Sequence, residues 1–389
     1  MISVCIITKN EEKNIERCLA SLSGYGFELV VVDTGSTDRT REIAQNYTDS
    51  LYDFAWCDDF SAAKNFCVSK AKNDIILVVD SDEFLEPLTE TELKKFLELV
   101  RQHPDWVGRI RRRNVFSRDG VKQENREWIN RIFDRRNYQY KGRIHEQITG
   151  RQGKEYQTWL SPLIFLHTGY DLSPEEREKK TQRNIFLLKQ ELSRVQEELE
   201  SLRRESADAK AYAEREGITL ENIGAGEMEE LQGQIPYLIY QLGKSYYMAG
   251  DYQKSCGYFE RGLSYDLNPK LEYVIDMTES YGYALINSGQ EEKALFFENI
   301  YEEFGHSADF QFLMGLIYMK NARFDAAIAE FEKALLHNDC RNAGVNSYAA
   351  NYNIGVIHEC LGDLDQARQY YQKCGEHQLA KRRLMEINT

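Results

Sequence analysis

The chain has 389 residues, of which 42% are hydrophobic and 29% are charged, and its formal net charge is −14. This length allows two or three domains of typical size, and the composition is that of a soluble globular protein. The acidic balance argues against generic nucleic-acid binding, and no apolar run approaches the roughly 20 residues that span a bilayer. The N-terminus lacks the basic segment of a signal peptide, and the eight cysteines never form a C-x-x-C pair. We therefore expect a cytoplasmic protein with free thiols.

Apolar runs and helical patterns alternate over the first hundred residues. The runs at residues 2–7, 28–33 and 75–79 are continuously apolar, which is typical of parallel strands that helices cover on both faces. We therefore expect an α/β domain with a doubly wound, mostly parallel sheet. In such sheets ligands bind beyond the carboxyl ends of the strands.

Two polar side chains precede helical patterns in this region. Asn10 stands before a pattern whose apolar positions are Ile15, Leu19 and Leu22, and Ser61 stands before the pattern "AAKNFCVSKAK". Both residue types are favoured at the first position of a helix. We therefore expect Asn10 and Ser61 to cap these two helices.

The chain changes character after Pro104. The segments "WVGRIRRRNVF", "GRIHEQITG" and "LIFLHTGY" are typical of strands separated by polar turns, so this half of the sheet is expected to be mixed or antiparallel. Residues 109–143 carry 12 basic and 4 acidic side chains. Two interpretations stay open: the basic excess binds an anionic ligand, or it lies on solvated strand faces.

A long helical segment begins at Pro174. Apolar residues recur in it at spacings of three and four, at Ile185, Leu188, Leu192, Val195, Leu199 and Leu202. This is the a/d seam of nearly three heptads. The seam either packs on the chain itself or forms a coiled-coil homodimer, and residues 204–233 are expected to be a connector.

The remainder of the chain repeats itself. A glycine recurs at the same place in four copies, one of them degenerate, at Gly243, Gly282, Gly315 and Gly355. Small and aromatic residues follow at matching offsets. The pattern resembles tetratricopeptide repeats, which are stacked helix pairs of about 34 residues. The expected domains are residues 1–172, an arm and connector at 173–233, and repeats at 234–389.

Carboxylates follow two of the apolar runs of the first domain. Asp33 ends one run before a Gly-Ser turn, and Asp80, Asp82 and Glu83 end another. A carboxylate at such a place can accept hydrogen bonds from a base edge or from ribose hydroxyls. Paired carboxylates are also suitable ligands for Mg²⁺ or Mn²⁺ when phosphate oxygens complete the coordination.

Four segments in this order resemble glycosyltransferase family 2 on the GT-A fold: "CIITKNEEKNIERCL", "VVVDTGSTDRT", "WCDDFSAAKNF" and "ILVVDSDEF". The later segments "NRIFDRRNYQYKGRIHEQI" and "HTGY" resemble the second half of that domain, so the resemblance covers about residues 1–170. The pattern DDF-x-x-x-[RK]-N with "IHE", followed by helical repeats, further resembles the bacterial group that includes peptide S-glycosyltransferases of the sublancin type.

The resemblance implies a site for a nucleotide-diphosphate sugar, with UDP-glucose as a typical donor. It places Asp33 against the base, usually uracil, and Asp82 on a divalent metal ion. The other implied nucleotide-sugar contacts are Thr8, Asn10, Glu11, Asp58, Lys64, Asn65, Asp80, Arg131 and Arg143. The implied metal ligands besides Asp82 are Asp80 and His167.

Inverting transfer needs a general base that deprotonates the acceptor. Glu146, in a segment expected to be a strand, is the first candidate, and His145 and Asp134 are the others. Glu83 stays unassigned. The repeats are expected to bind a peptide or protein acceptor or to dimerise the enzyme.

Three alternatives remain at this stage. The first is a non-catalytic interaction protein, which gives no reason for the set Asp33, Asp80 and Asp82. The second is a glycosyltransferase of cell-envelope polysaccharides. A nucleotidyltransferase is disfavoured, because "TKNEEKN" lacks the glycines of a triphosphate-binding loop.

Overall fold

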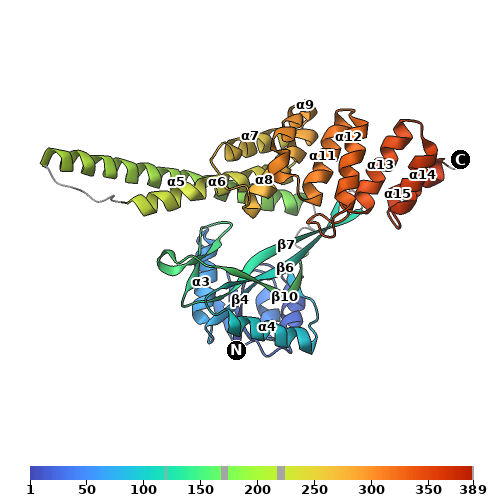
Figure 1. Ribbon diagram of the computed structural model, residues 1–389. Helices are drawn as coiled ribbons and strands as arrows, with labels where there is room; N and C mark the ends of the chain where they lie inside the picture. Colours follow the sequence, from blue (N-terminus) through green and yellow to red (C-terminus); the bar gives the residue numbers. More distant parts are fainter. Residues whose placement is uncertain (119–120, 168–173, 217–223, 388–389) are drawn as a thin grey trace. The chain divides into compact units, whose positions relative to one another are not determined.

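The computed structural model describes residues 1–118, 121–167, 174–216 and 224–387. The chain divides into two compact units, Met1–Arg177 and Glu178–Thr389, the first built on a sheet and the second on helices (Figure 1). The expected domain boundary at residue 172 and part of the expected connector, residues 217–223, lie outside the described residues. Within the described ranges, no helix is long and apolar enough to cross a membrane.

The first unit contains an eight-stranded sheet with the order β3-β2-β1-β4-β7-β6-β10-β5. Its strands are β1 (Ile2–Thr8), β2 (Glu28–Asp33), β3 (Leu51–Asp53), β4 (Ile75–Asp80), β5 (Glu83–Leu85), β6 (Val107–Arg118), β7 (Val121–Asp134) and β10 (Thr158–His167). The first four strands are parallel neighbours, while β7 and β5 run antiparallel to theirs. The expected mostly parallel sheet with a mixed second half is confirmed.

A separate hairpin follows the long strand β7. It consists of β8 (Tyr138–Lys141) and β9 (Gln147–Gly150). The expectation of one strand over "GRIHEQITG" is therefore wrong in its first half, because residues 142–146 form the loop of this hairpin. Gly142 has a φ of 98°, a backbone conformation that glycine adopts without strain.

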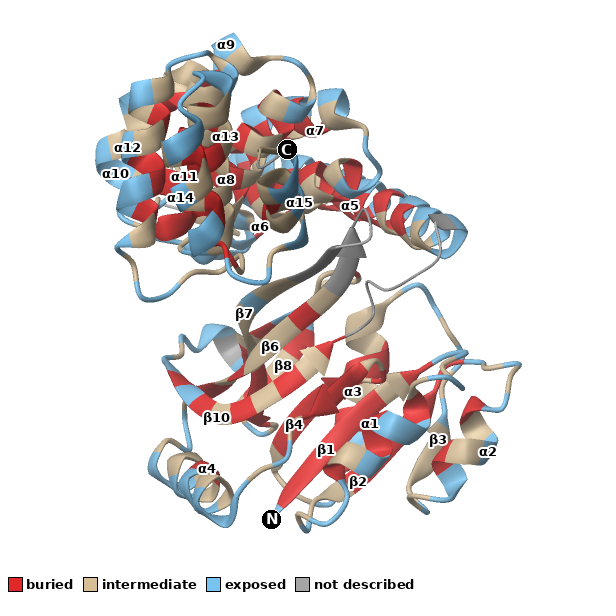
Figure 2. Ribbon diagram, turned by 90° about the vertical axis from the view of Figure 1, so that its right-hand side faces the viewer, coloured by how far each residue is buried: buried red, intermediate tan, exposed pale blue. Residues whose placement is uncertain are grey.

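Four helices accompany the sheet: α1 (Ile15–Leu22), α2 (Thr40–Gln45), α3 (Phe60–Lys70) and α4 (Glu90–Gln102). Apolar residues of the central strands are buried on both faces of the sheet, as the red strands of Figure 2 show. This double coverage explains why β1, β2 and β4 are continuously apolar in sequence.

Both expected helix caps are wrong. Asn10 lies outside α1, and its side chain instead accepts a hydrogen bond of 2.8 Å from the Thr37 N–H. The cap of α3 is Asp59, which accepts from the Ala62 N–H at 2.8 Å, while the Ser61 hydroxyl donates to Asp59. A carboxylate two residues earlier in the chain thus takes the capping position expected for Ser61.

The second unit is an array of helices. They are α5 (Pro174–Glu216, which begins in the first unit), α6 (Ala225–Met248), α7 (Tyr252–Leu263), α8 (Glu272–Asn287), α9 (Glu291–Ala294), the 3₁₀ helix η2 (Leu295–Ile300), α10 (Tyr301–Phe304), α11 (Ala308–Lys320), α12 (Phe324–Leu335), α13 (Tyr348–Cys360), α14 (Leu364–Lys373) and α15 (Gln378–Ile387). In the degenerate second repeat, the helix that pairs with α8 is broken into short pieces.

The recurring glycines allow close packing inside each helix pair. A Cβ atom at Gly243, Gly315 or Gly355 would lie 2.5–2.6 Å from a ring carbon of the aromatic residue 16 positions later. Such a distance is far below van der Waals contact, so only glycine lets the aromatic ring of the second helix rest on the first.

The heptad seam of α5 is buried within the single chain. Its members Leu188 and Val195 are fully buried, and Leu192 is 7% exposed. On an adjacent turn, the Lys189 ammonium lies 5.6 Å from the ring centroid of Tyr246 in α6. The structure therefore favours packing of the seam on its own chain over a coiled-coil homodimer.

Gly315→Ala should lower the free energy of unfolding by roughly 1–3 kcal/mol, because the added methyl overpacks the core at 2.6 Å from the Phe331 ring. Gly257→Ala is the matched control, since Gly257 lies inside α7 with nothing within 4 Å of its Cβ position. It should raise stability by roughly 0.5–1 kcal/mol. Denaturant titration followed by circular dichroism measures both variants, and equal effects would contradict this account of the repeat.

Candidate active site at the carboxyl ends of the parallel strands

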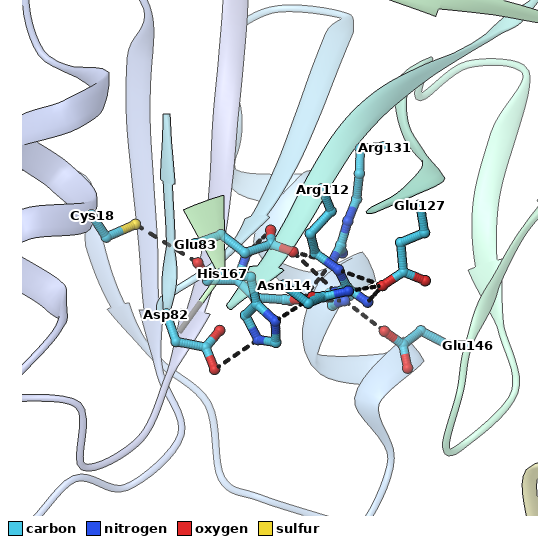
Figure 3. A network of polar contacts seen from close by, with 11 residues as sticks. Cys18, Asp82, Glu83, Arg112, Asn114, Glu127, Arg131, Glu146 and His167 are labelled. Atoms are coloured by element: carbon cyan, nitrogen blue, oxygen red, sulfur yellow. Dashed lines mark hydrogen bonds and ion pairs between the residues drawn. The ribbon is translucent and has the colours of Figure 1, made fainter. Parts of the chain in front are cut away.

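Glu83, which the sequence left unassigned, lies at the centre of a buried polar network (Figure 3). It is completely buried. Its Oε1 accepts hydrogen bonds from Arg112 and Arg131, both at 3.1 Å, and its Oε2 accepts from the Asp80 N–H at 3.0 Å. Glu83 therefore fixes the turn between β4 and β5 and sets the position of Asp80.

Sheet register brings distant parts of the chain to Glu83. His167 on β10 lies opposite Glu83 on β5 and, on its other side, opposite Asn114 on β6. Residues opposite each other on adjacent strands point to the same face of a sheet. This row of three side chains borders the D-x-D segment, and sequence spacing gives no sign of it.

Asp80, the first carboxylate of the D-x-D pair, faces two buried cations. The Lys64 ammonium lies 3.2 Å from one of its oxygens, and Arg131 donates a hydrogen bond to the other. Partial burial opposes ionisation, but Arg131 and Lys64 outweigh it and hold the pKa of Asp80 well below its usual range. Lys64 also lies 2.5 Å from Glu146 and so joins Asp80 to the loop of the β8–β9 hairpin.

Asp82 and His167 form a second, separate pair. His167 Nε2 lies 3.3 Å from Asp82 Oδ2, and the two side chains are 7% and 16% exposed. A carboxylate oxygen and an imidazole nitrogen at this distance fit a divalent metal such as Mn²⁺ or Mg²⁺. Asp80, expected as a further ligand, contacts Lys64 and Arg131 in this structure, and its role as a ligand stays a prediction.

The protein alone does not provide a complete metal cage. Over the residues that the structure describes, no group of three or more His, Cys, Asp or Glu side chains is arranged to hold a metal ion. A metal held by Asp82 and His167 therefore needs further ligands from bound substrate, such as diphosphate oxygens.

Two buried polar atoms lie at the carboxyl ends of β1 and β2. Asp33 Oδ2 accepts from the N–H groups of Gly35 and Ser36 at 3.1 and 2.9 Å. In the described part of the chain, Asp33 Oδ1 and Thr8 Oγ1 are buried and have no hydrogen-bond partner. The two residues lie opposite each other at the carboxyl ends of β2 and β1. Because buried polar groups are nearly always paired, these atoms point to a bound ligand or water.

Asn10 and Glu11 shape the loops beside Asp33. The Asn10 N–H donates to Ser36 Oγ at 2.9 Å, and the Glu11 N–H donates to Thr40 Oγ1 at 2.7 Å. Asn10 takes a φ of 55° to make these contacts. Both residues thus join the loops that follow β1 and β2, beside Asp33.

The remaining expected nucleotide-sugar contacts have structural partners. The Asn65 amide accepts from the Tyr140 N–H and donates to the Tyr140 carbonyl, both at 2.9 Å. Asp58 accepts from Trp56 Nε1 at 2.8 Å, and Arg143 donates to the carbonyl of Cys57 at 3.4 Å. Asn65 therefore holds strand β8, while Asp58 and Arg143 lie on neighbouring segments at the rim.

Tyr140 is a site residue that sequence reasoning missed. Its ring centroid lies 5.3 Å from the Lys64 ammonium. Burial raises the pKa of Tyr140 to about 12, although Lys64 and Arg131 oppose the rise. In the described chain its hydroxyl has no hydrogen-bond partner, so a phenolic donor is available beside the cations.

The three candidate bases occupy different places. Glu146, 12% exposed, and His145 lie on the hairpin loop, and Glu146 reaches the site through Lys64. Asp134 pairs in register with Ile75, the first residue of β4, and binds Arg136 at 2.6 Å. It therefore lies at the opposite end of the strands from Asp80, and the structure does not bring it to the other candidate residues.

Several basic side chains of residues 109–143 form ion pairs within the unit. Arg112 pairs with Glu127 at 2.8 Å, Arg113 with Glu124 at 2.9 Å, and Arg135 with Asp74 at 3.2 Å. These three arginines therefore have structural partners. Lys64 and Arg131 are the cations that contact Asp80.

Glu83→Gln should destabilise the first unit by roughly 3–5 kcal/mol, because it leaves the buried guanidinium groups of Arg112 and Arg131 without a shared counter-charge. Glu90→Gln is the control, because Glu90 forms a solvent-exposed ion pair with Lys94. Loss of such a pair should change stability little. Thermal unfolding of both variants tests this, and a Glu83 variant as stable as wild type would refute the assignment.

Comparison with known proteins identifies both parts of the chain. Residues 3–153 match the family described as Glycosyl transferase family 2, and residues 237–261 and 312–374 match tetratricopeptide repeats. These matches cover the two regions in which the sequence motifs resemble the same families.

Three curated relatives agree with this division. A TPR repeat-containing protein of Synechococcus elongatus is 44% identical over 97 residues, which are 25% of this chain and 24% of that protein. An uncharacterized glycosyltransferase of Rickettsia bellii is 38% identical over 93 residues, or 24% and 31% of the two proteins. The prophage-derived glycosyltransferase SunS of Bacillus subtilis is 26% identical over 202 residues, or 49% and 45%.

The chain thus matches less than half the length of each of these relatives. The family matches and the sheet agree with the expected GT-A-like fold and with the glycosyltransferase class of enzymes. The chain therefore carries an N-terminal glycosyltransferase family 2 domain, with a mostly parallel GT-A-like sheet, followed by tetratricopeptide repeats.

Proposed function

We propose that the chain transfers a sugar from a nucleotide-diphosphate sugar, with a UDP-sugar favoured, to a peptide, protein or glycan acceptor. The observation that carries this proposal is the pair of buried, unpartnered atoms Asp33 Oδ1 and Thr8 Oγ1. They lie at the strand ends where nucleotides bind in such sheets. A base edge or ribose hydroxyl would supply the missing hydrogen bonds.

The donor diphosphate would lie beside the cations of the site. Lys64 and Arg131 offer fixed positive charge in a partly water-excluded place, where it stabilises developing negative charge most effectively. Asp82 and His167 would hold Mg²⁺ or Mn²⁺. When bound, the metal supplies further positive charge to the leaving diphosphate.

Glu146 is the proposed general base. Its carboxylate lies 2.5 Å from the Lys64 ammonium, which also contacts Asp80. As the acceptor oxygen or sulfur bonds to the anomeric carbon, its proton passes to Glu146. The bond from that carbon to the diphosphate oxygen breaks with inversion, and its electron pair leaves with the nucleoside diphosphate. His145, on the same loop, is the second candidate.

The tetratricopeptide repeats would bind the acceptor. Stacked helix pairs present extended surfaces suited to peptides, and residues 174–389 carry 24 basic and 36 acidic side chains, which favours a basic partner. A mass-spectrometric screen with UDP-glucose and candidate peptides tests both donor and acceptor. Sugar transfer to a peptide supports the proposal, and transfer only to glycans would assign the acceptor differently.

UDP should bind more tightly in the presence of Mn²⁺ or Mg²⁺, as measured by calorimetry. Asp82→Asn should remove this metal dependence while metal-free UDP binding stays, because the proposed contact with the base is made by Asp33. Asp33→Asn should weaken UDP binding with and without metal. If the affinity for UDP is the same with and without Mn²⁺ or Mg²⁺, the proposed role of Asp82 and His167 is excluded.

Glu146→Gln should lower turnover by roughly 10²–10⁴-fold, the usual contribution of a general base, while donor binding stays close to wild type. Glu155→Gln is the control, since Glu155 is an exposed carboxylate of the same region. Release of UDP in the presence of the identified acceptor measures both. Near-normal turnover of the Glu146 variant would show that another residue is the general base.

A further inference from the structure

A chain of polar contacts approaches His167 from the β6–β7 hairpin. Asn114 Nδ2 donates to Glu127 Oε1 at 2.6 Å, and Asn114 Oδ1 lies 2.7 Å from His167 Nδ1. The other ring nitrogen, Nε2, lies 3.3 Å from Asp82. Figure 3 shows these side chains pointing toward one another, Asn114, Glu127 and His167 from separate strands and Asp82 from the turn before β5. No sequence motif singled out Asn114 or Glu127.

The chemistry of Glu127 decides which way the Asn114 amide points. Arg112 donates to Glu127 Oε1 through Nε at 3.1 Å and Nη2 at 2.8 Å, and these bonds favour the ionised carboxylate. An ionised carboxylate only accepts hydrogen bonds. The amide nitrogen of Asn114 must therefore face Glu127, and its oxygen must face His167.

The amide in turn decides which His167 nitrogen carries hydrogen. The Asn114 oxygen can only accept, so the Nδ1 at 2.7 Å donates to it. Neutral imidazole with hydrogen on Nδ1 has its lone pair on Nε2, the atom beside Asp82. Asn114 is 3% exposed, so little water can compete for this contact.

We propose that Asn114, held by Glu127 and Arg112, is a positioning residue that fixes the Nδ1–H tautomer of His167, so that Nε2 and Asp82 together bind a divalent cation. This inference rests on the proposed function, because it deepens the metal site assigned there. Partners of this kind orient a ligating histidine and raise its basicity. Asn114 on β6 and Glu127 on β7 thereby support the proposed metal site at Asp82 and His167.

Asn114→Leu tests the proposal, because leucine has a similar shape and cannot accept a hydrogen bond. The affinity for Mn²⁺ in the presence of saturating UDP should fall by roughly 10–100-fold, as measured by electron paramagnetic resonance. Nitrogen-15 NMR should show His167 as the Nδ1–H tautomer in wild type and a mixture of tautomers in the variant. Asn130→Leu is the matched control, since Asn130 on β7 donates to Tyr156 outside the site.

If the leucine variant fails to fold, variants that exchange the hydrogen-bond donor and acceptor between positions 114 and 127 provide a second test. Asn114→Asp alone places a carboxylate against Glu127 and should weaken Mn²⁺ binding. The double variant Asn114→Asp with Glu127→Gln restores a donor facing an acceptor and should recover most of the Mn²⁺ affinity. A merely structural role of Asn114 would change the melting temperature without changing the tautomer.

The outcomes separate this proposal from the proposed function. Wild-type Mn²⁺ affinity and an unchanged tautomer in Asn114→Leu, together with lost affinity in Asp82→Asn, would overturn the positioning role and leave the metal site standing. Absence of Mn²⁺ binding by wild type with UDP would overturn both assignments of the metal. Metal-free UDP binding that depends on Asp33 would still support the nucleotide side of the proposed function.

Discussion

The site depends on one buried carboxylate, Glu83, held between two guanidinium groups. Removing charges from water costs several kcal/mol for each ion unless partners compensate. Glu83 is the shared counter-charge of Arg112 and Arg131 and so offsets the free energy of burying them. It also accepts a hydrogen bond from the Asp80 N–H. The D-x-D turn is thus anchored, and its two aspartates have different partners: Asp80 faces buried cations, whereas Asp82 faces His167.

The two halves of the sheet contribute different chemistry to this arrangement. The parallel strands β1 and β2 end in acceptor and hydroxyl groups, Thr8 and Asp33, which suit a nucleoside. The mixed half brings Arg131 and His167, which suit a diphosphate and its metal. The helical repeats follow another constraint, in which glycine lets an aromatic ring lie directly on the neighbouring helix.

Local sequence signals predicted most of the elements and several site residues. The apolar strands, the long helix and the recurring glycines all match the structure, because each depends on neighbours close in sequence. The predicted capping role of Ser61 is wrong, because the side chain of Asp59, two residues earlier in the sequence, caps α3 instead. Asp134 lies away from the other candidate residues, because residue type and order in sequence do not reveal at which end of the sheet a strand finishes.

The sequence by itself determined the fold class, the repeat array and the carboxylates that follow the apolar strands, since hydrophobic periodicity and turn chemistry are local properties. Only the tertiary structure decided how Glu83, His167 and Asn114 form one row, because strand register joins residues far apart in the chain. It also decided that Lys64 links Asp80 to Glu146. Ion pairs form between charged side chains that are close in space, and separation along the sequence does not reveal that distance.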